Sequence, residues 1–177
     1  MSGRPRVVAR RCPDCGSLLL ATAGVRWMTC TACPSALDPF AVPAERLPTF
    51  RPAGAGADEA RRLAFYVFES AATEAPAWIW IPAFRILSTD SRSDPGALLA
   101  RKGYRPELVA APLGSALART PDEARALAAL RLGAKAEEAD LRAARLVSLS
   151  CRVSMGNVAE KVSGFVAPAG SLRPPPA

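Results

Sequence analysis

The stretch CPDCGSLLLATAGVRWMTCTAC, residues 12–33, decides how the first part of this chain folds. It holds two C-x2-C pairs separated by fourteen residues. Two residues between cysteines let the backbone turn tightly enough to aim both sulfurs at one ion, and the intervening segment is long enough to bring the two pairs face to face. The spacing therefore predicts one four-cysteine metal site. Its ligands are Cys12, Cys15, Cys30 and Cys33.

The first cysteine pair carries further local signals. Pro13 fixes φ early in the turn, and Gly16 can adopt the positive φ that lets backbone amides point at sulfur. Residues 10–36 resemble the zinc-ribbon family. The resemblance rests on the CPDCG turn, the CTAC pair and Trp27. The resemblance implies a structural Zn²⁺ bound by all four cysteines. The chain departs from the family pattern at Pro34, which follows the second pair in place of glycine.

Other metal chemistries use related cysteine patterns. Within the ribbon, residues 18–21 and 24–28 flank Gly24 and are expected to form the two strands of one hairpin. An iron site of the rubredoxin kind uses similar turns, usually with a longer separation and a glycine after both pairs. A redox-active C-x-x-C needs one pair only, in a thioredoxin-like βαβ context that the sequence lacks. Four thiolates close the coordination shell, so the expected site is structural rather than catalytic.

Composition divides the chain into five segments, and the predicted fold class is α+β. Dense prolines and glycines do not sustain a strand or helix, so the third segment is expected to be a linker. The segments are a basic arm over residues 1–9, an N-terminal zinc ribbon of β-hairpins over 10–37, a Pro/Gly/Ala-rich linker over 38–60, a small mixed α+β domain over 61–167 and a disordered Pro-rich tail over 168–177.

The α+β segment contains three strand patterns. Two continuous apolar runs, residues 63–68 and 78–81, are rich in aromatic and β-branched side chains and are expected to be strands buried on both faces, although the first run could also be the end of a helix capped by Asp58. Trp78 and Trp80 then belong to the core, although they could also stack bases. Residues 147–155 alternate apolar with polar side chains, which predicts a half-buried strand with Cys151 as an inert buried thiol. We expect a turn at residues 156–157 and a partner strand over residues 161–167.

Helix signals are clearest at Thr120. This residue can serve as N-cap, with Pro121 at the first helical position and Glu123 completing a capping box. The expected apolar stripe of this helix is Ala124, Leu127, Ala128 and Leu130, and Gly133 is its natural stop. Shorter helices are expected over residues 96–102, before Gly103, and over residues 136–145.

The chain is basic, with a formal net charge of +7 and a predominance of arginine. Four thiolates and one divalent ion would lower that charge to about +5. Basic character favours contact with acidic partners or nucleic acid, although a merely solvated basic face gives the same composition. The pattern lacks the exposed aromatic residues that accompany many nucleic-acid surfaces. The candidate phosphate contacts are Arg4, Arg6, Arg10, Arg11 and Arg26.

Several classes of activity are poorly supported by this composition. The chain contains no histidine, which removes the commonest general base and the Ser–His and Cys–His nucleophile pairs. No P-loop or dinucleotide fingerprint occurs. Glu69 and Glu74 flank the aromatic runs and are the acids an enzyme could use. No signal peptide or membrane-spanning run is visible, and the paired cysteines suit a reducing compartment, so we expect a cytoplasmic protein without membrane insertion.

These features suggest what the chain does. The stretch WIWIPAFRI, residues 78–86, is similar to uncharacterised bacterial proteins that couple a zinc ribbon to strands with proline and aromatic residues. The leading hypothesis is a zinc-binding, non-enzymatic interaction or scaffold protein of the bacterial cytoplasm, in which the ribbon presents a rigid surface to a protein partner. The alternative is a nucleic-acid-binding zinc-ribbon protein that uses its arginine-rich arm.

Overall fold

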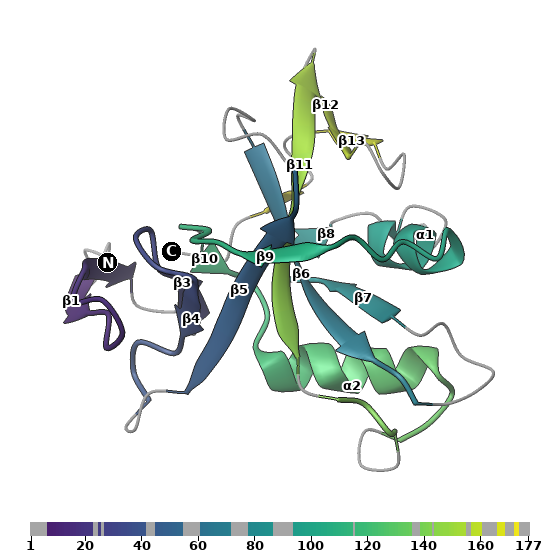
Figure 1. The fold of residues 1–177 in the computed structure, drawn as a ribbon, viewed down its shortest axis with the longest axis horizontal. Helices are drawn as coiled ribbons and strands as arrows, with labels where there is room; N and C mark the ends of the chain where they lie inside the picture. Colours follow the sequence, from purple (N-terminus) through teal and green to yellow (C-terminus); the bar gives the residue numbers. More distant parts are fainter. Residues whose placement is uncertain are drawn as a thin grey trace, which may run out of the picture.

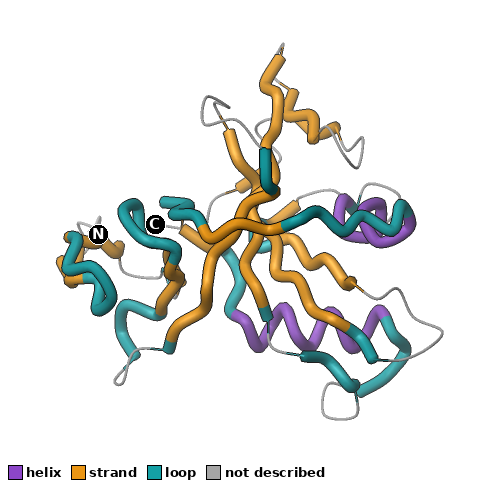
Figure 2. The backbone as a smooth tube through the Cα atoms, viewed as in Figure 1, coloured by secondary structure: helices purple, strands orange, loops and turns teal. Residues whose placement is uncertain are grey.

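The chain is mostly β-sheet, with two helices among the residues that the structure describes (Figures 1 and 2). In this computed structural model those residues are 7–22, 25, 27–41, 45–54, 61–71, 78–86, 94–114, 116–135, 139–142, 144–154, 157–160, 166–168 and 172–173. The helices are α1 (Pro95–Arg101) and α2 (Pro121–Arg131). The predicted α+β class fits this content of helices and strands.

The strands of the described residues fall into three sheets. The largest has ten strands, with the order β10-β3-β4-β5-β11-β12-β13, with β6 between β11 and β7 and with β9 on β5. Two small sheets pair β1 with β2 and β8 with β14. The strands are β1 (Val7–Arg11), β2 (Leu18–Thr22), β3 (Trp27–Thr29), β4 (Ser35–Leu37), β5 (Arg46–Pro52), β6 (Arg61–Glu69), β7 (Trp78–Pro82), β8 (Arg85–Ile86), β9 (Leu108–Ala110), β10 (Ala116–Leu117), β11 (Arg145–Ser154), β12 (Asn157–Glu160), β13 (Val166–Pro168) and β14 (Leu172–Arg173).

The antiparallel strands β7, β6 and β11 form the centre of the core, and both of their faces are buried. Tyr66 and Ile81 belong to a cluster that includes the alanines of α2, whereas Phe65 and Trp80 belong to a second cluster with Leu99 of α1. Successive residues of a strand point to opposite faces, so the continuous apolar runs supply both clusters. The predicted strands over residues 63–68 and 78–81 are therefore confirmed, and Trp80 is a core residue, fully buried against Phe65 and Tyr104.

The start of α2 agrees with the sequence in detail. The Thr120 hydroxyl accepts a hydrogen bond from the Glu123 N–H at 3.2 Å, and the Glu123 carboxylate accepts one from the Thr120 N–H at 2.8 Å. Pro121 occupies the first turn, and Gly133 follows the helix with φ +68°. The capping box and the stop residue are confirmed. The short helix predicted near residues 96–102 is also confirmed, as α1.

The predicted apolar stripe of α2 is wrong in its leucines. Ala124 and Ala128 are fully buried, but Leu127 is 36% exposed and Leu130 is 72% exposed. The third buried residue is Ala129, and at the end of the helix the guanidinium of the exposed Arg131 donates to the Trp80 carbonyl and pairs with Asp94. These polar contacts fix the rotation of the helix, which leaves its leucines outward.

Two segments assigned by composition or pattern differ in the structure. The stretch 38–60 was expected to lack lasting strands, yet β5 lies within it and pairs with β4, β9 and β11. Pairing on both sides outweighs the local effect of its prolines. The helix predicted over 136–145 is absent from its described residues 139–142, 144 and 145, the last of which begins β11. There Leu141 forms a β-bridge with Ser70, and the Arg142 N–H donates to the Glu69 carbonyl at 3.0 Å. Residues 136–138 and 143 lie outside the described part.

The end of the chain also differs from expectation. The predicted strand over residues 147–155 is confirmed as β11, but its hairpin partner is β12, directly after the turn, rather than a strand over residues 161–167. Residues 166–168 form β13, and Leu172–Arg173 of the expected disordered tail pair with β8. Residues 155–156 and 161–165 lie outside the described residues. No described helix has the length and apolar character needed to cross a membrane.

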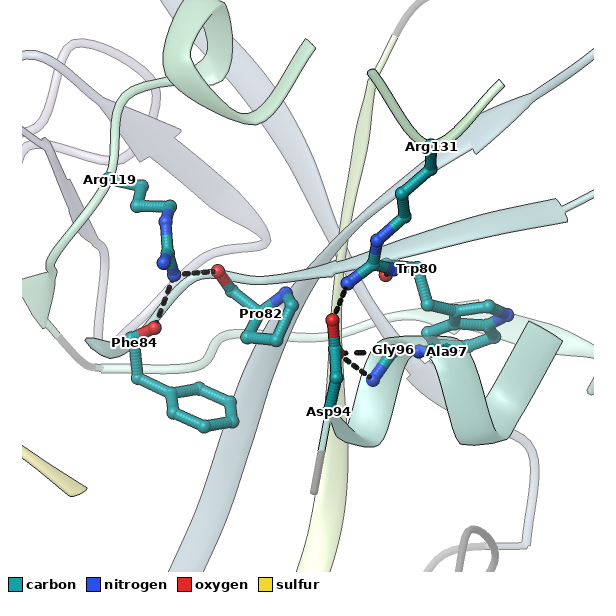
Figure 3. A network of polar contacts seen from close by, with 8 residues as sticks. All are labelled: Trp80, Pro82, Phe84, Asp94, Gly96, Ala97, Arg119 and Arg131. Carbon is teal, nitrogen blue, oxygen red and sulfur yellow. Dashed lines mark hydrogen bonds and ion pairs between the residues drawn. The ribbon is translucent and has the colours of Figure 1, made fainter. Parts of the chain in front are cut away.

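A network of arginines ties α1 and the α2 segment to the centre of the sheet (Figure 3). Arg119 donates to the carbonyls of Pro82 and Phe84 at 2.7 and 2.5 Å. Its burial lowers the pKa of its guanidinium. Arg131 reaches both the Trp80 carbonyl and Asp94, and Asp94 caps α1 by accepting from its first backbone N–H groups (Figure 3). The arginines thus satisfy carbonyl groups that β7 and its following turn leave unpaired.

Close approach of α1 to β7 requires glycine at position 96. A Cβ placed on Gly96 would lie 2.0 Å from the Trp80 carbonyl oxygen. Replacing Gly96 by alanine should destabilise the protein by about 1–3 kcal/mol, because the helix must shift away from the strand. An ordinary Gly-to-Ala change within a helix has the opposite sign, with a gain of roughly 0.5–1 kcal/mol. Urea unfolding followed by tryptophan fluorescence would measure the change.

The matched control for Gly96→Ala is Ala100→Gly in the same helix. It should cost only the roughly 0.5–1 kcal/mol of helix propensity. If Gly96→Ala raised the unfolding midpoint, the close contact between α1 and Trp80 would be wrong.

Candidate metal centre

The first cysteine pair lies in the turn that joins β1 to β2. The Cys12 N–H donates to the Ser17 carbonyl at 2.8 Å, and the Gly16 N–H donates to the Cys12 carbonyl at the same distance. Gly16 has φ +75°, as its position in the sequence predicts. These bonds close the turn so that both sulfurs of the pair, Cys12 and Cys15, face the same side.

The second pair lies in the equivalent turn between β3 and β4. Here the Cys30 N–H donates to the Ser35 carbonyl at 2.8 Å and the Ser35 N–H donates to the Cys33 carbonyl at 2.9 Å. The Ala32 N–H lies 3.4 Å from the Cys30 sulfur and donates to it. An amide-to-sulfur bond therefore forms in this turn despite the proline. The Pro34 carbonyl accepts the Thr49 N–H of β5 at 3.0 Å, so the proline links the turn to the main sheet.

Each turn belongs to its own hairpin, which corrects the predicted pairing. The sequence suggested that residues 18–21 and 24–28 pair across Gly24, but β2 pairs with β1 and β3 pairs with β4. Residues 23, 24 and 26 lie outside the described part. The two hairpins bring their turns together from different sheets, since β3 also pairs with β10 and β4 with β5.

The four sulfur atoms converge on one point. The Cys12 and Cys33 sulfurs are 3.6 Å apart, as are those of Cys15 and Cys30, and all four lie within 4.8 Å of one another. A tetrahedral site with metal–sulfur bonds of about 2.3 Å has sulfurs about 3.8 Å apart. The cluster therefore fits one tetrahedrally bound ion. Cys12 and Cys30 are buried, Cys33 is half-buried and Cys15 is exposed.

Asp14 joins the two turns beside the sulfurs, a contact that the sequence pattern did not reveal. Its carboxylate accepts the Ser35 hydroxyl of the second turn at 2.5 Å and pairs with Arg46 of β5, also at 2.5 Å. Arg11 donates to the Gly16 carbonyl at 3.1 Å on the other side of the first turn. Such exposed contacts contribute little stability individually, but the Asp14 carboxylate ties the first turn both to the second turn and to β5.

The surroundings of Cys12, Cys15 and Cys33 shift the pKa values of their thiols in different directions. Hydrogen bonds from the side chain and backbone of Ser17 lower the pKa of Cys15 to about 6. Burial raises the pKa of Cys33 to about 12 and also raises that of Cys12 above its ordinary value. One ligand is therefore ionised at neutral pH, whereas at least two must lose a proton before they can bind a metal.

The other predicted site residues are placed as follows. Arg10 and Arg11 are both exposed on β1, beside the first turn. Arg4, Arg6 and Arg26, the remaining candidates for phosphate contact, lie outside the described residues. Cys151 is buried on β11, more than nine-tenths shielded, as predicted for a core thiol. Its position in the sheet separates it from the four-cysteine cluster, which holds only the other cysteines.

A cavity of about 510 Å³ opens between the ribbon and the start of α2. The exposed Phe40 lies at its wall, and its acidic lining residues are Asp38, Glu45 and Asp122. The Thr120 hydroxyl in the lining already accepts the Glu123 N–H. Several carboxylates that line one concave surface repel anions. This cavity is therefore unsuited to phosphate groups.

Comparison with protein families, with curated proteins and with solved structures gave no match for this chain. The metal site therefore rests on the geometry of its own four cysteines.

Serine substitution of a cluster cysteine should release the metal. Cys12→Ser and Cys33→Ser each remove one of four ligands, so we expect the metal content of desalted protein to fall from about one ion per chain to near zero. The hairpins around the turns should then lose protection from hydrogen exchange, whereas β6, β7 and β11 should keep it, because their clusters contain none of the four ligands. The matched control is Cys151→Ala, which should retain the full metal content; retention of the ion by Cys12→Ser would contradict the assignment.

Metal binding should weaken steeply as pH falls. Because the pKa values of Cys12 and Cys33 are raised, binding displaces at least two protons near neutral pH. The apparent affinity should therefore fall at least about a hundredfold for each pH unit lost between pH 8 and 6.5. Competition with a chromophoric chelator across this range would measure the slope. A change of tenfold or less per unit would show that the thiols are already ionised.

Proposed function

We propose that this chain is a zinc-binding, non-enzymatic interaction or scaffold protein of the bacterial cytoplasm. The observation that carries the proposal is the convergence of four cysteine sulfurs within 4.8 Å. Four thiolates fill a tetrahedral shell and leave no position for substrate, which is the arrangement of a structural site. The metal would then stabilise a surface rather than perform a reaction.

Zinc is the metal that this donor set suits best. Soft thiolate ligands in a tetrahedral arrangement select Zn²⁺ or iron among the common biological metals. The CPDCG turn and the separation of the pairs resemble zinc ribbons more than rubredoxin-like iron sites, which usually carry a glycine after both pairs. Here the second turn has Pro34 and Ser35 instead.

The connection of the ribbon to the sheet supports a role as a rigid interaction surface. The second turn is hydrogen-bonded to β5 through Pro34, and β4 pairs with β5 over three residue pairs. Trp27 of the ribbon is 3% exposed and packs in the cluster that contains the alanines of α2. A metal-stabilised element fixed to the core in this way keeps its exposed face in a constant orientation, which lowers the entropic cost of binding a partner.

Elemental analysis of the intact protein tests the zinc assignment directly. We expect one zinc per chain, little iron, and no visible absorption band of the kind that an iron–thiolate centre gives. Chelation should abolish the binding of any protein partner that copurifies, because the ribbon surface would lose its shape. Iron at one equivalent would replace zinc in the proposal, and the absence of both metals would refute it. A monomer that retains no partner would count against the scaffold role.

The alternative is a nucleic-acid-binding protein, favoured by the exposure of the consecutive residues Arg10 and Arg11 on β1. Phosphate contacts by the arginine-rich arm would make binding fall steeply with salt. Filter binding of single- and double-stranded DNA and of RNA, at about 20 and 150 mM salt, separates the two hypotheses. The leading hypothesis expects no retention at low salt. Retention that is lost at the higher salt and in the Arg10→Glu/Arg11→Glu variant would establish the alternative.

A further inference from the structure

One face of the β1–β2 hairpin is packed against the rest of the protein, and the other, its open face, is exposed to solvent. Alternate residues of β2 point to opposite sides, and Leu19 and Ala21 are 3% and 1% exposed, with Leu19 packed in the small cluster around the cysteines. On the other side, Leu18 and Leu20 are 59% and 61% exposed. Their cross-strand partners on that open side are Arg11 and Ala9, respectively. Two neighbouring leucines thus lie in water beside an arginine.

The edge of β2 is also available. Among the described residues, β1 and β2 pair only with each other. Edge strands of natural proteins are usually protected by charged side chains, proline or a covering element. Strand β2, with the sequence LLLAT, has neither a charged residue nor a proline. A strand edge that no other described strand pairs with, next to two exposed leucines, is the arrangement to which an extended peptide adds as a further strand.

The positive charge of β1 determines which kind of added strand would bind at the edge of β2. Arg10 and Arg11 are exposed on β1, one on each side of the hairpin, and the chain carries a net charge of +7. A strand added to β2 lies about 10 Å from β1, since neighbouring strands are about 4.8 Å apart. That distance is close to the Debye length at physiological salt, so acidic residues on the added strand are attracted and basic ones repelled. A second copy of this hairpin would place its own arginines near Arg10 and Arg11, and the like charges would repel one another.

We infer that the open face of the β1–β2 hairpin and the uncharged edge of β2 bind an extended, acidic segment of a partner protein that alternates apolar with acidic residues. The inference rests on the proposed role as an interaction protein and names the surface and the partner chemistry. Apolar side chains of the segment cover Leu18 and Leu20, and its backbone pairs with the edge of β2. Nucleic acid is a poorer occupant, because phosphates and sugars do not bury two leucines on a strand.

The probe for this inference is a fluorescein-labelled nine-residue peptide that alternates valine with glutamate, titrated into the full-length, metal-loaded protein. Its matched control alternates valine with lysine, and a single-stranded DNA oligonucleotide is the third ligand. Fluorescence anisotropy should show saturable binding of the acidic peptide only. Leu18→Ser/Leu20→Ser should weaken this binding about tenfold or more, because the apolar contact is lost. Leu127→Ser/Leu130→Ser on the exposed face of α2 should leave it unchanged.

Charge reversal supplies the second arm of the experiment. Arg10→Glu/Arg11→Glu should weaken binding of the acidic peptide and confer binding of the lysine peptide. All variants must retain one metal ion per chain, which shows that the hairpin is intact. Equal binding by the Leu18→Ser/Leu20→Ser variant, no binding at tens of micromolar, or preference for the oligonucleotide would overturn the inference. So would a dimer that these leucine substitutions dissociate, because a second copy would then be the occupant.

The outcome is distinguishable from failure of the proposed function. Metal-loaded protein that does not bind the acidic peptide refutes the docking surface and leaves the structural metal site in place. Protein without zinc or iron refutes the metal proposal whatever the peptide does.

Discussion

Thr49 is the residue at which the cysteine-bearing hairpins and the main sheet are joined. Its backbone N–H donates to the Pro34 carbonyl of the second turn, and its own carbonyl accepts the Ala111 N–H at 3.1 Å. Its hydroxyl donates to the Ala111 carbonyl at 2.6 Å, and the whole residue is buried. Threonine at this position therefore satisfies polar groups of two other segments, at Pro34 and at Ala111, in a place where unpaired groups would be costly. Through the register Leu146↔Thr49, β5 also pairs with the central strand β11.

Local chemistry was predictable wherever a residue acts on its immediate neighbours. The capping box of Thr120 and Glu123, the left-handed glycine after the first cysteine pair, and the convergence of the four cysteines all follow from short-range rules. The strands buried on both faces also followed, because a continuous apolar run needs cover on each side. Long-range pairing could not be predicted in the same way. Strand β5 is rich in proline and is held by partners that lie before and after it in sequence, and no local signal reports them.

The errors on α2 and after it have the same origin. A helical pattern of alanines and leucines does not determine which side of the helix is buried. In the structure, the hydrogen bond from Arg131 to the Trp80 carbonyl helps to fix that orientation. Likewise, the acids and alanines near residue 140 suit a helix, but the backbone there pairs with the end of β6. At the candidate metal centre, the cysteine cluster was predictable from the sequence, whereas the Asp14 link between the turns was not. Asp14 contacts Ser35 and Arg46, which lie 21 and 32 positions further along the chain.

The attachment of the cysteine-bearing hairpins to the sheet decides what a metal bound by the four cysteines would stabilise. A ribbon on a flexible linker would gain metal-binding energy for itself alone. In this chain the second turn lies between β3 and β4, β4 pairs with β5, and β5 pairs with β11. Ala36 of β4 and Trp27 of β3 also belong to the cluster that α2 covers. In the described part of the chain, β1 and β2 share no strand pairing with the large sheet, and this first hairpin is held mainly by the cysteine cluster and the Asp14 contacts. Metal binding is therefore expected to fix the position of β1 and β2 far more than that of β3 and β4, because the latter retain their strand partners without it.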